Sequence, residues 1–100
     1  MTFRIQKSID KRAVTLSLSG QLDDEGIAEL RRLIDHYTDG HQLILDLEDV
    51  GLVDGDAIRS LTVFESLGIR LVNSPIYVRD WMSREVGKGV NYKKSKNRRI

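Results

Sequence analysis

Apolar and polar residues alternate along the first part of the chain, with the period of two that is typical of half-buried β-strands. The alternation is clearest in AVTLSLSG (13–20), where Val14, Leu16 and Leu18 face one way and the residues between them carry hydroxyl groups. Residues 3–9 form a similar segment, separated from it by the polar residues 10–12. The pattern therefore predicts two strands joined by a short turn, with Gly20 ending the second.

Three further segments carry apolar residues three and four positions apart, which predicts helices with one buried face. They span residues 23–40, residues 54–68, and a stretch that begins at Pro75. The residues expected to face inward are Ile27, Leu30, Leu33, Ile34 and Tyr37 in the first helix, Ile58, Leu61 and Phe64 or Leu67 in the second, and Val78, Trp81 and Met82 in the third. The expected N-caps are Asp23 or Asp24, Asp54 and Ser74, and the expected stops are Gly40 and Gly68.

Two strands, residues 42–50 and 69–73, separate these helices, so the element order is β-β-α-β-α-β-α. Strands that alternate with single helices pair in parallel through right-handed crossovers. The strands at 13–20 and 42–50 each keep one polar face, whereas parallel strands covered on both faces are continuously apolar. We therefore expect a single small α/β domain with a four-stranded, mostly parallel (mixed) sheet and all helices on one face. A doubly wound nucleotide-binding fold is disfavoured.

Length, composition and charge limit the organisation of the chain. One hundred residues without cysteine suit one domain without disulfides or thiolate metal sites. The start MTFRIQKSID has no long apolar run, so we expect neither a signal peptide nor a membrane span, and a cytoplasmic location. Residues 1–84 carry ten basic and fourteen acidic residues, while residues 85–100 carry six basic residues and one acidic residue. This predicts a domain over 1–86 and a basic, flexible tail over 87–100 that makes at most weak contact with nucleic acid.

The segment LVDGDAI (52–58) is the main candidate for chemistry. A D-x-D motif after an apolar strand is typical of magnesium-dependent phosphatases, in which one aspartate is the nucleophile and the other acts as acid and base. The residues before it, EDVG, make a poor strand, and the chain is short for the rest of that machinery. The alternative interpretation is that Asp54 caps a helix and Asp56 lies in its first turn. The position of the motif favours this second interpretation.

Other candidate sites are weaker. His36 and His41 flank a turn without further ligands nearby, which indicates exposed side chains rather than a metal pair. Asp46 and Glu48 share the polar face of a strand and could form an acid–base pair, but solvated carboxylates are the simpler interpretation. Tyr77 and Trp81 lie at helical spacing in an apolar stripe, which favours core packing. We therefore predict no catalytic residues, no metal site and no cofactor.

Three stretches of this chain resemble the STAS family, the anti-sigma-factor antagonist domain. LSLSGQLD (16–23) is similar to the second strand and glycine turn of the family, and LILDLEDVGLVDGDAI (43–58) to its central strand and loop. LGIRLVNSPIYVRDW (67–81) is similar to its closing segment. The resemblance covers about residues 3–85 and implies the same one-way-wound sheet that the alternation predicts.

The resemblance implies a binding module, not an enzyme. In anti-sigma antagonists a serine or threonine after the loop aspartate is phosphorylated by a partner kinase, which releases the bound anti-sigma factor. By position, Asp54 matches the loop aspartate and Gly55 falls on the phosphorylated residue, so the acceptor hydroxyl is missing; Ala57 falls on the family's glycine. The resemblance thus implies a partner-binding loop comprising Asp54, Gly55, Asp56 and Ile58.

The implied partner is a regulatory protein, either an anti-sigma factor or a kinase-like protein, bound constitutively. The resemblance also leaves a homodimer open. Two alternatives stay open as well: a STAS domain that senses a nucleotide or other small molecule, since some relatives bind nucleotides, and the magnesium-dependent phosphatase.

Overall fold

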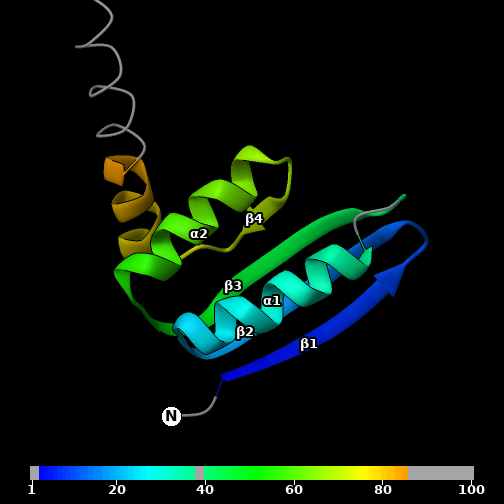
Figure 1. Cartoon of the computed structure of the whole chain (residues 1–100), viewed down its shortest axis with the longest axis horizontal. Coiled ribbons are helices and arrows are strands. Elements are labelled where there is room, and N and C mark those ends of the chain that lie inside the picture. The colour runs from blue at the N-terminus through cyan, green and yellow to red at the C-terminus, as the bar shows by residue number, and fades with distance from the viewer. Residues whose placement is uncertain (1–2, 38–39, 86–100) are drawn as a thin grey trace, which may run out of the picture.

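The computed structural model describes residues 3–37 and 40–85 and shows a four-stranded sheet in the order β1-β2-β3-β4 (Figure 1). The strands are β1 (Phe3–Asp10), β2 (Ala13–Leu22), β3 (Gln42–Val53) and β4 (Arg70–Val72). β1 pairs antiparallel with β2, and the pairs β2–β3 and β3–β4 are parallel. Sequential strands are therefore neighbours throughout, as the predicted one-way winding requires.

The helices cover a single face of this sheet. Helix α1 (Asp24–Tyr37) and helix α2 (Gly55–Ser66) both lie in front of the strands in Figure 1. Along β2, Val14, Leu16 and Leu18 are buried while the hydroxyl residues between them are only partly covered. The period-2 alternation explains why the helices lie on one face, because only one face of each strand carries enough apolar surface to be covered. The predicted fold class is confirmed.

The ends of β2 and β3 differ from the prediction. Gly20 does not end β2, and β3 does not stop at Val50; the two strands continue to Leu22 and Val53. Register shifts between Ser17 and Ser19 and between Gly20 and Gln21 mark two irregularities in the ladder, each giving β3 one extra residue. Such bulges break the period-2 pattern, because the inward residues of β3 then recur every third position.

The end of α2 follows the prediction more closely. Gly68 has a positive φ of 98°, its N–H donates to the carbonyl of Glu65 at 3.0 Å, and the N–H of Ile69 donates to the carbonyl of Phe64 at 3.2 Å. These bonds satisfy the last carbonyls of the helix. Of the two inward candidates, Phe64 is buried and Leu67 is 71% exposed, so the Leu67 alternative is wrong. Leu67 is the C-cap residue and no longer on the buried helical face.

A third helix covers residues 76–85. The prediction that Ser74 caps it is wrong. The N–H groups of Val78 and Arg79 both donate to the carbonyl of Pro75, so the helix starts one residue later than expected. The Ser74 hydroxyl is buried and has no hydrogen-bond partner among the described residues. The helix contributes Val78 and Met82 to the core.

One hydrophobic core lies between the sheet and the helices. Most of the predicted inward residues are buried in it; Leu33, Tyr37 and Trp81 pack against it and stay partly exposed. No helix among the described residues is long and apolar enough to cross a membrane. The predicted tail over residues 87–100 lies outside the described residues, so the domain boundary stays a prediction.

Candidate functional site

The turn between β3 and α2 is built around Asp54. The Asp54 carboxylate accepts a hydrogen bond from the N–H of Ala57 at 2.8 Å, and the Asp54 carbonyl accepts one from the N–H of Ile58 at 3.0 Å. The Asp54 N–H in turn donates to the carbonyl of Leu22 at 3.4 Å, which ties the turn to the end of β2. Asp54 is therefore the predicted N-cap, and both its side chain and its backbone hold the turn in one conformation.

The surface of this turn is a mixture of one apolar and several charged side chains. Leu52 is 61% exposed, and Asp54 and Asp56 are exposed beside it. Asp56 forms an ion pair with Arg59 on the next turn of α2. We call Leu52, Asp54, Gly55, Asp56 and Arg59 the recognition turn. The side chains of Leu52, Asp56 and Arg59 are exposed to another molecule without any rearrangement of the backbone.

Ile58 does not belong to this surface. Its side chain is fully buried in the core, and Ala57 before it is buried as well. The sequence grouped Ile58 with the loop because the resemblance places it there, but the first turn of α2 points it at the sheet. Ile58 therefore attaches the start of α2 to the hydrophobic core, and its side chain is not available to a partner.

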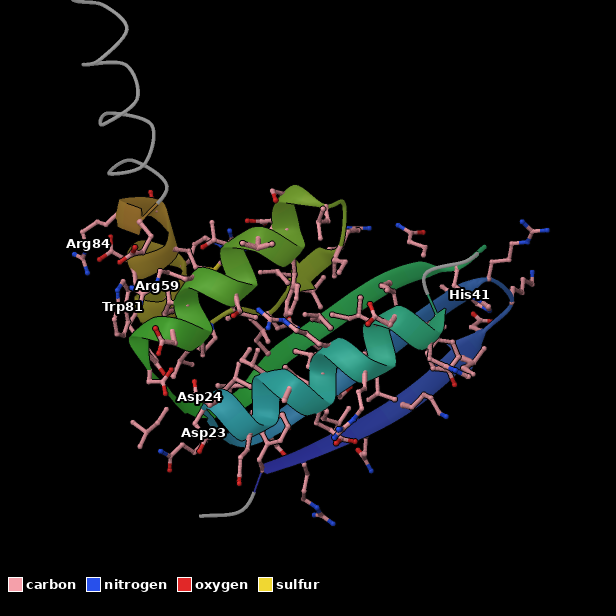
Figure 2. All side chains as sticks on the ribbon, viewed as in Figure 1. Asp23, Asp24, His41, Arg59, Trp81 and Arg84 are labelled. Carbon is pink, nitrogen blue, oxygen red and sulfur yellow. The ribbon has the colours of Figure 1, made fainter. Side chains whose placement is uncertain are left out.

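Gly55 is the first residue of α2 and faces Trp81 of the 76–85 helix. A β-carbon added to Gly55 stands 3.6 Å from Cζ2 of Trp81 and 4.0 Å from Nη1 of Arg59, both ordinary contact distances. Figure 2 shows Arg59 and Trp81 close together at this end of the molecule. Trp81 is half-buried rather than fully inside, so it joins the core to the recognition turn.

Tyr77 connects the same helix to β3. Its hydroxyl donates a 2.7 Å hydrogen bond to the carbonyl of Gly51, next to Leu52. The ring is 44% exposed, so the predicted core position of Tyr77 is wrong: the side chain lies at the surface with its hydroxyl on the strand. Its partial burial raises the pKa of the Tyr77 phenol above its usual value of 10.0.

The start of α1 adds further negative charge to this end of the molecule. Asp23 caps α1 by accepting a 3.2 Å hydrogen bond from the N–H of Gly26, and Asp24 follows it (Figure 2). β2 and β3 are parallel, and their last residues, Leu22 and Val53, pair with each other. The helices that follow them, α1 and α2, therefore begin at the same end of the sheet. The acidic residues at the starts of α1 and α2 therefore lie at one end of the molecule. Two of them, Asp23 and Asp54, are also the N-caps of these helices.

The other candidate chemistries find little support in the geometry. His36 and His41 are exposed, each with its ring edge-on to Tyr37. Asp46 accepts hydrogen bonds from the Glu48 N–H and the Asn73 side chain, so it braces the strand. Within residues 3–37 and 40–85 no group of three or more histidine, aspartate or glutamate side chains could hold a metal ion.

Sequence reasoning missed three residues of this region. Leu52 lies in the part of β3 beyond Val50, which the predicted strand over 42–50 did not include, so its place on an extended strand was not foreseen. Arg59 reaches the recognition turn from the second turn of α2, and Trp81 reaches it from the 76–85 helix. The apolar stripe of the 76–85 helix predicted that Trp81 faces inward, but it did not predict the contact with α2.

No protein-family model and no curated protein matches the sequence. Solved structures do match its fold, among them two anti-sigma factor antagonists. The antisigma-factor antagonist, STAS domain, from Rhodobacter sphaeroides aligns with a TM-score of 0.56 at 18% identity, over 71% of this chain and 86% of that chain. The anti-sigma factor antagonist SpoIIAA in its unphosphorylated form aligns with a TM-score of 0.56 at 17% identity, over 78% and 79% of the two chains. The chain thus has the STAS fold, and its function has to be argued from its own surface.

Proposed function

We propose that the chain is a non-enzymatic regulatory module that binds another protein through the recognition turn, in the manner of an anti-sigma factor antagonist. The observation that carries this proposal is the combination of a fixed backbone and exposed side chains. Asp54 locks the turn through three hydrogen bonds, while Leu52 and Asp56 stand exposed on it. A rigid turn presenting an apolar side chain among charges loses little entropy when a partner binds.

The charge of the turn indicates the chemistry of the partner. Asp54 and Asp56 at the start of α2 adjoin Asp23 and Asp24 at the start of α1, and Arg59 is already paired with Asp56. A basic protein surface complements this end of the molecule and is steered toward it. In line with the anti-sigma factor antagonists that share this fold, the proposed partner is an anti-sigma factor or a kinase-like regulator, and the proposed location is the cytoplasm.

Binding is constitutive in this proposal because Gly55 has no hydroxyl group to phosphorylate. Asp56 carries one charge, one residue beyond the phosphosite position, and is already paired with Arg59, so it is a weak mimic of a phosphate. The nearest hydroxyl along α2, that of Ser60, accepts a 3.3 Å hydrogen bond from the Arg31 guanidinium of α1. Regulation then depends on the amount of protein rather than on a modification of the turn.

The two aspartates of the turn do not form a phosphatase centre in this account. The Asp54 carboxylate is committed to the helix cap and Asp56 to Arg59. No observation supports the nucleotide-sensing alternative either, because the cleft beside α1 is lined by three acidic residues, Asp23, Glu25 and Glu29, and by a single basic one, Lys7. Three carboxylates repel phosphate groups.

Affinity capture with the full chain as bait tests this proposal. We compare the wild type, a Leu52→Ser/Asp56→Lys variant, and a Leu67→Ser control that removes another exposed leucine, at the far end of α2. The proposal expects one protein, recovered in stoichiometric amount by the wild type and by the control and lost from the double variant. Equal recovery by all three baits excludes the recognition turn as the binding surface.

A further inference from the structure

A groove runs between the edge strand β1 and helix α1, on the helix-covered side of the sheet. It has a volume of about 620 Å³. Its floor is apolar, formed by Phe3 and Ile5 of β1 and Leu33 of α1, all only partly buried. Gly26 keeps α1 close to this floor, since a β-carbon there would stand 3.2 Å from the Phe3 ring. The groove thus exposes apolar surface that nothing in the described chain covers.

One wall of the groove is strongly acidic. Asp23, Glu25 and Glu29 line it from the first two turns of α1, and Glu25 has no ion-pair partner within the described part of the chain. Lys7 is the single basic residue among the described residues that line the groove, and its Nζ lies 5.4 Å from the centre of the Tyr37 ring. Tyr37 ends α1, so Lys7 sits far along the helix from Glu25, and the end of the groove near Glu25 stays negative.

The backbone of β1 is open along this groove. β1 lies at the edge of the sheet and pairs only with β2 among the described strands. An open edge accepts an extended segment beside it, with alternate side chains directed into pockets. The inward-facing Lys7 at the middle of β1 disfavours pairing with a second β1, because like charges would then meet.

An occupant therefore needs basic residues for the acidic wall and a few apolar residues for the floor. Residues 88–99, KGVNYKKSKNRR, have this composition: six basic residues, no acidic residue, and Val90 and Tyr92 ahead of the main basic run. They lie outside the described residues, and Lys93 to Arg99 follow Glu85 by eight to fourteen positions. Such a stretch spans up to roughly 26–46 Å when extended, while the molecule measures 49 Å by 33 Å by 21 Å.

We propose that the β1–α1 groove is the docking site of the chain's own basic segment, residues 88–99. The Lys and Arg side chains meet Asp23, Glu25 and Glu29, and Val90 or Tyr92 covers Phe3, Ile5 and Leu33. The attraction is mainly electrostatic at an exposed surface, so it weakens steeply as salt rises. Docking is reversible and does not depend on the proposed function of the recognition turn.

The chain contains no cysteine, so a Ser95→Cys substitution gives a single attachment site for a nitroxide spin label on the full-length protein. Amide signals in a ¹⁵N NMR spectrum then report which surface the label approaches. We expect strong broadening at residues 3–7 and 23–29 in low salt. The broadening should fall several-fold in 0.5 M NaCl and in a Glu25→Gln/Glu29→Gln variant.

A Glu48→Gln/Asp49→Asn variant is the matched control, since it removes two exposed acids from β3, which β2 separates from β1, and should leave the broadening unchanged. Broadening elsewhere, none at all, or an equal loss in both variants overturns the proposal. A mixture of ¹⁵N-labelled protein without nitroxide and unlabelled protein with nitroxide distinguishes docking between two copies from docking within one chain. Groove broadening of equal strength in that mixture means docking between two copies and contradicts docking within one chain.

Discussion

The indole ring of Trp81 lies against Gly55, with Cζ2 of Trp81 3.6 Å from the place where a β-carbon of Gly55 would stand. Gly55 is not among the glycines with positive φ, so its backbone is one that any residue adopts. Gly55, which the resemblance places at the phosphorylated position of the family, therefore has room for a serine side chain.

We predict that Gly55→Ser folds with little change in stability. The contact at 3.6 Å is ordinary, and the loss of glycine freedom in the unfolded chain offsets small adjustments near Trp81, so the expected change is within about 1 kcal/mol. Thermal unfolding measures it. A fall in Tm of more than about 8 °C, the shift that 1 kcal/mol produces at most in a domain of this size, contradicts the geometry at Gly55.

Asp54→Ala removes the cap of α2 and should destabilise the protein by about 1 kcal/mol, within a range of 0.5–2 kcal/mol. For a domain of this size, 1 kcal/mol corresponds to a Tm shift of about 4–8 °C. Asp54→Ser keeps an oxygen for the Ala57 N–H and is the control, with a smaller loss. Equal losses in the two variants would show that the side-chain cap contributes nothing.

Asp56→Asn separates the two roles of the second aspartate. As a first-turn carboxylate paired with Arg59 at the surface, Asp56 contributes at most about 1 kcal/mol to stability. We expect a Tm close to that of the wild type together with weaker partner binding. An unchanged affinity, with or without a change in Tm, would remove Asp56 from the recognition surface.

Stability at high pH should depend on Tyr77. Burial raises the pKa of the folded-state phenol above 10.0, so the folded protein keeps the proton that the unfolded chain loses. This contribution is complete below pH 10 and is lost as the pH rises through the folded-state pKa. Urea midpoints between pH 8.5 and 11 should therefore fall less for Tyr77→Phe than for the wild type. If the urea midpoints of the two proteins fall equally over this pH range, Tyr77 does not cause the loss of stability at high pH.

The sequence predicted the sheet order and the single helix-covered face because alternation in β2 and β3 leaves few other ways to bury Leu16 and Leu45. The Asp54 cap followed from its place before an apolar helical stripe. The length of β3 could not be predicted, because its two bulges interrupt the period of two and bring Val50 to the inward face.

The surface of the site was harder to predict than its backbone. Leu52 lies beyond Val50, where the predicted strand ended. The burial of Ile58 agrees with the apolar stripe of α2 and disagrees with the exposed loop position that the resemblance implied. The contact of Tyr77 with Gly51 joins residues that are 26 positions apart, which no local pattern records.

The central claim is that the recognition turn binds a protein, and crosslinking from that turn tests it most directly. A photoreactive amino acid replaces Leu52 in one full-length variant and Leu67 in another, and both are expressed in the native cells and irradiated. We predict one dominant protein adduct from position 52, absent from position 67, with no phosphate on residues 52–60 of the recovered chain. Identical adducts from both positions, an adduct from position 67 alone, or no adduct from either would contradict the account.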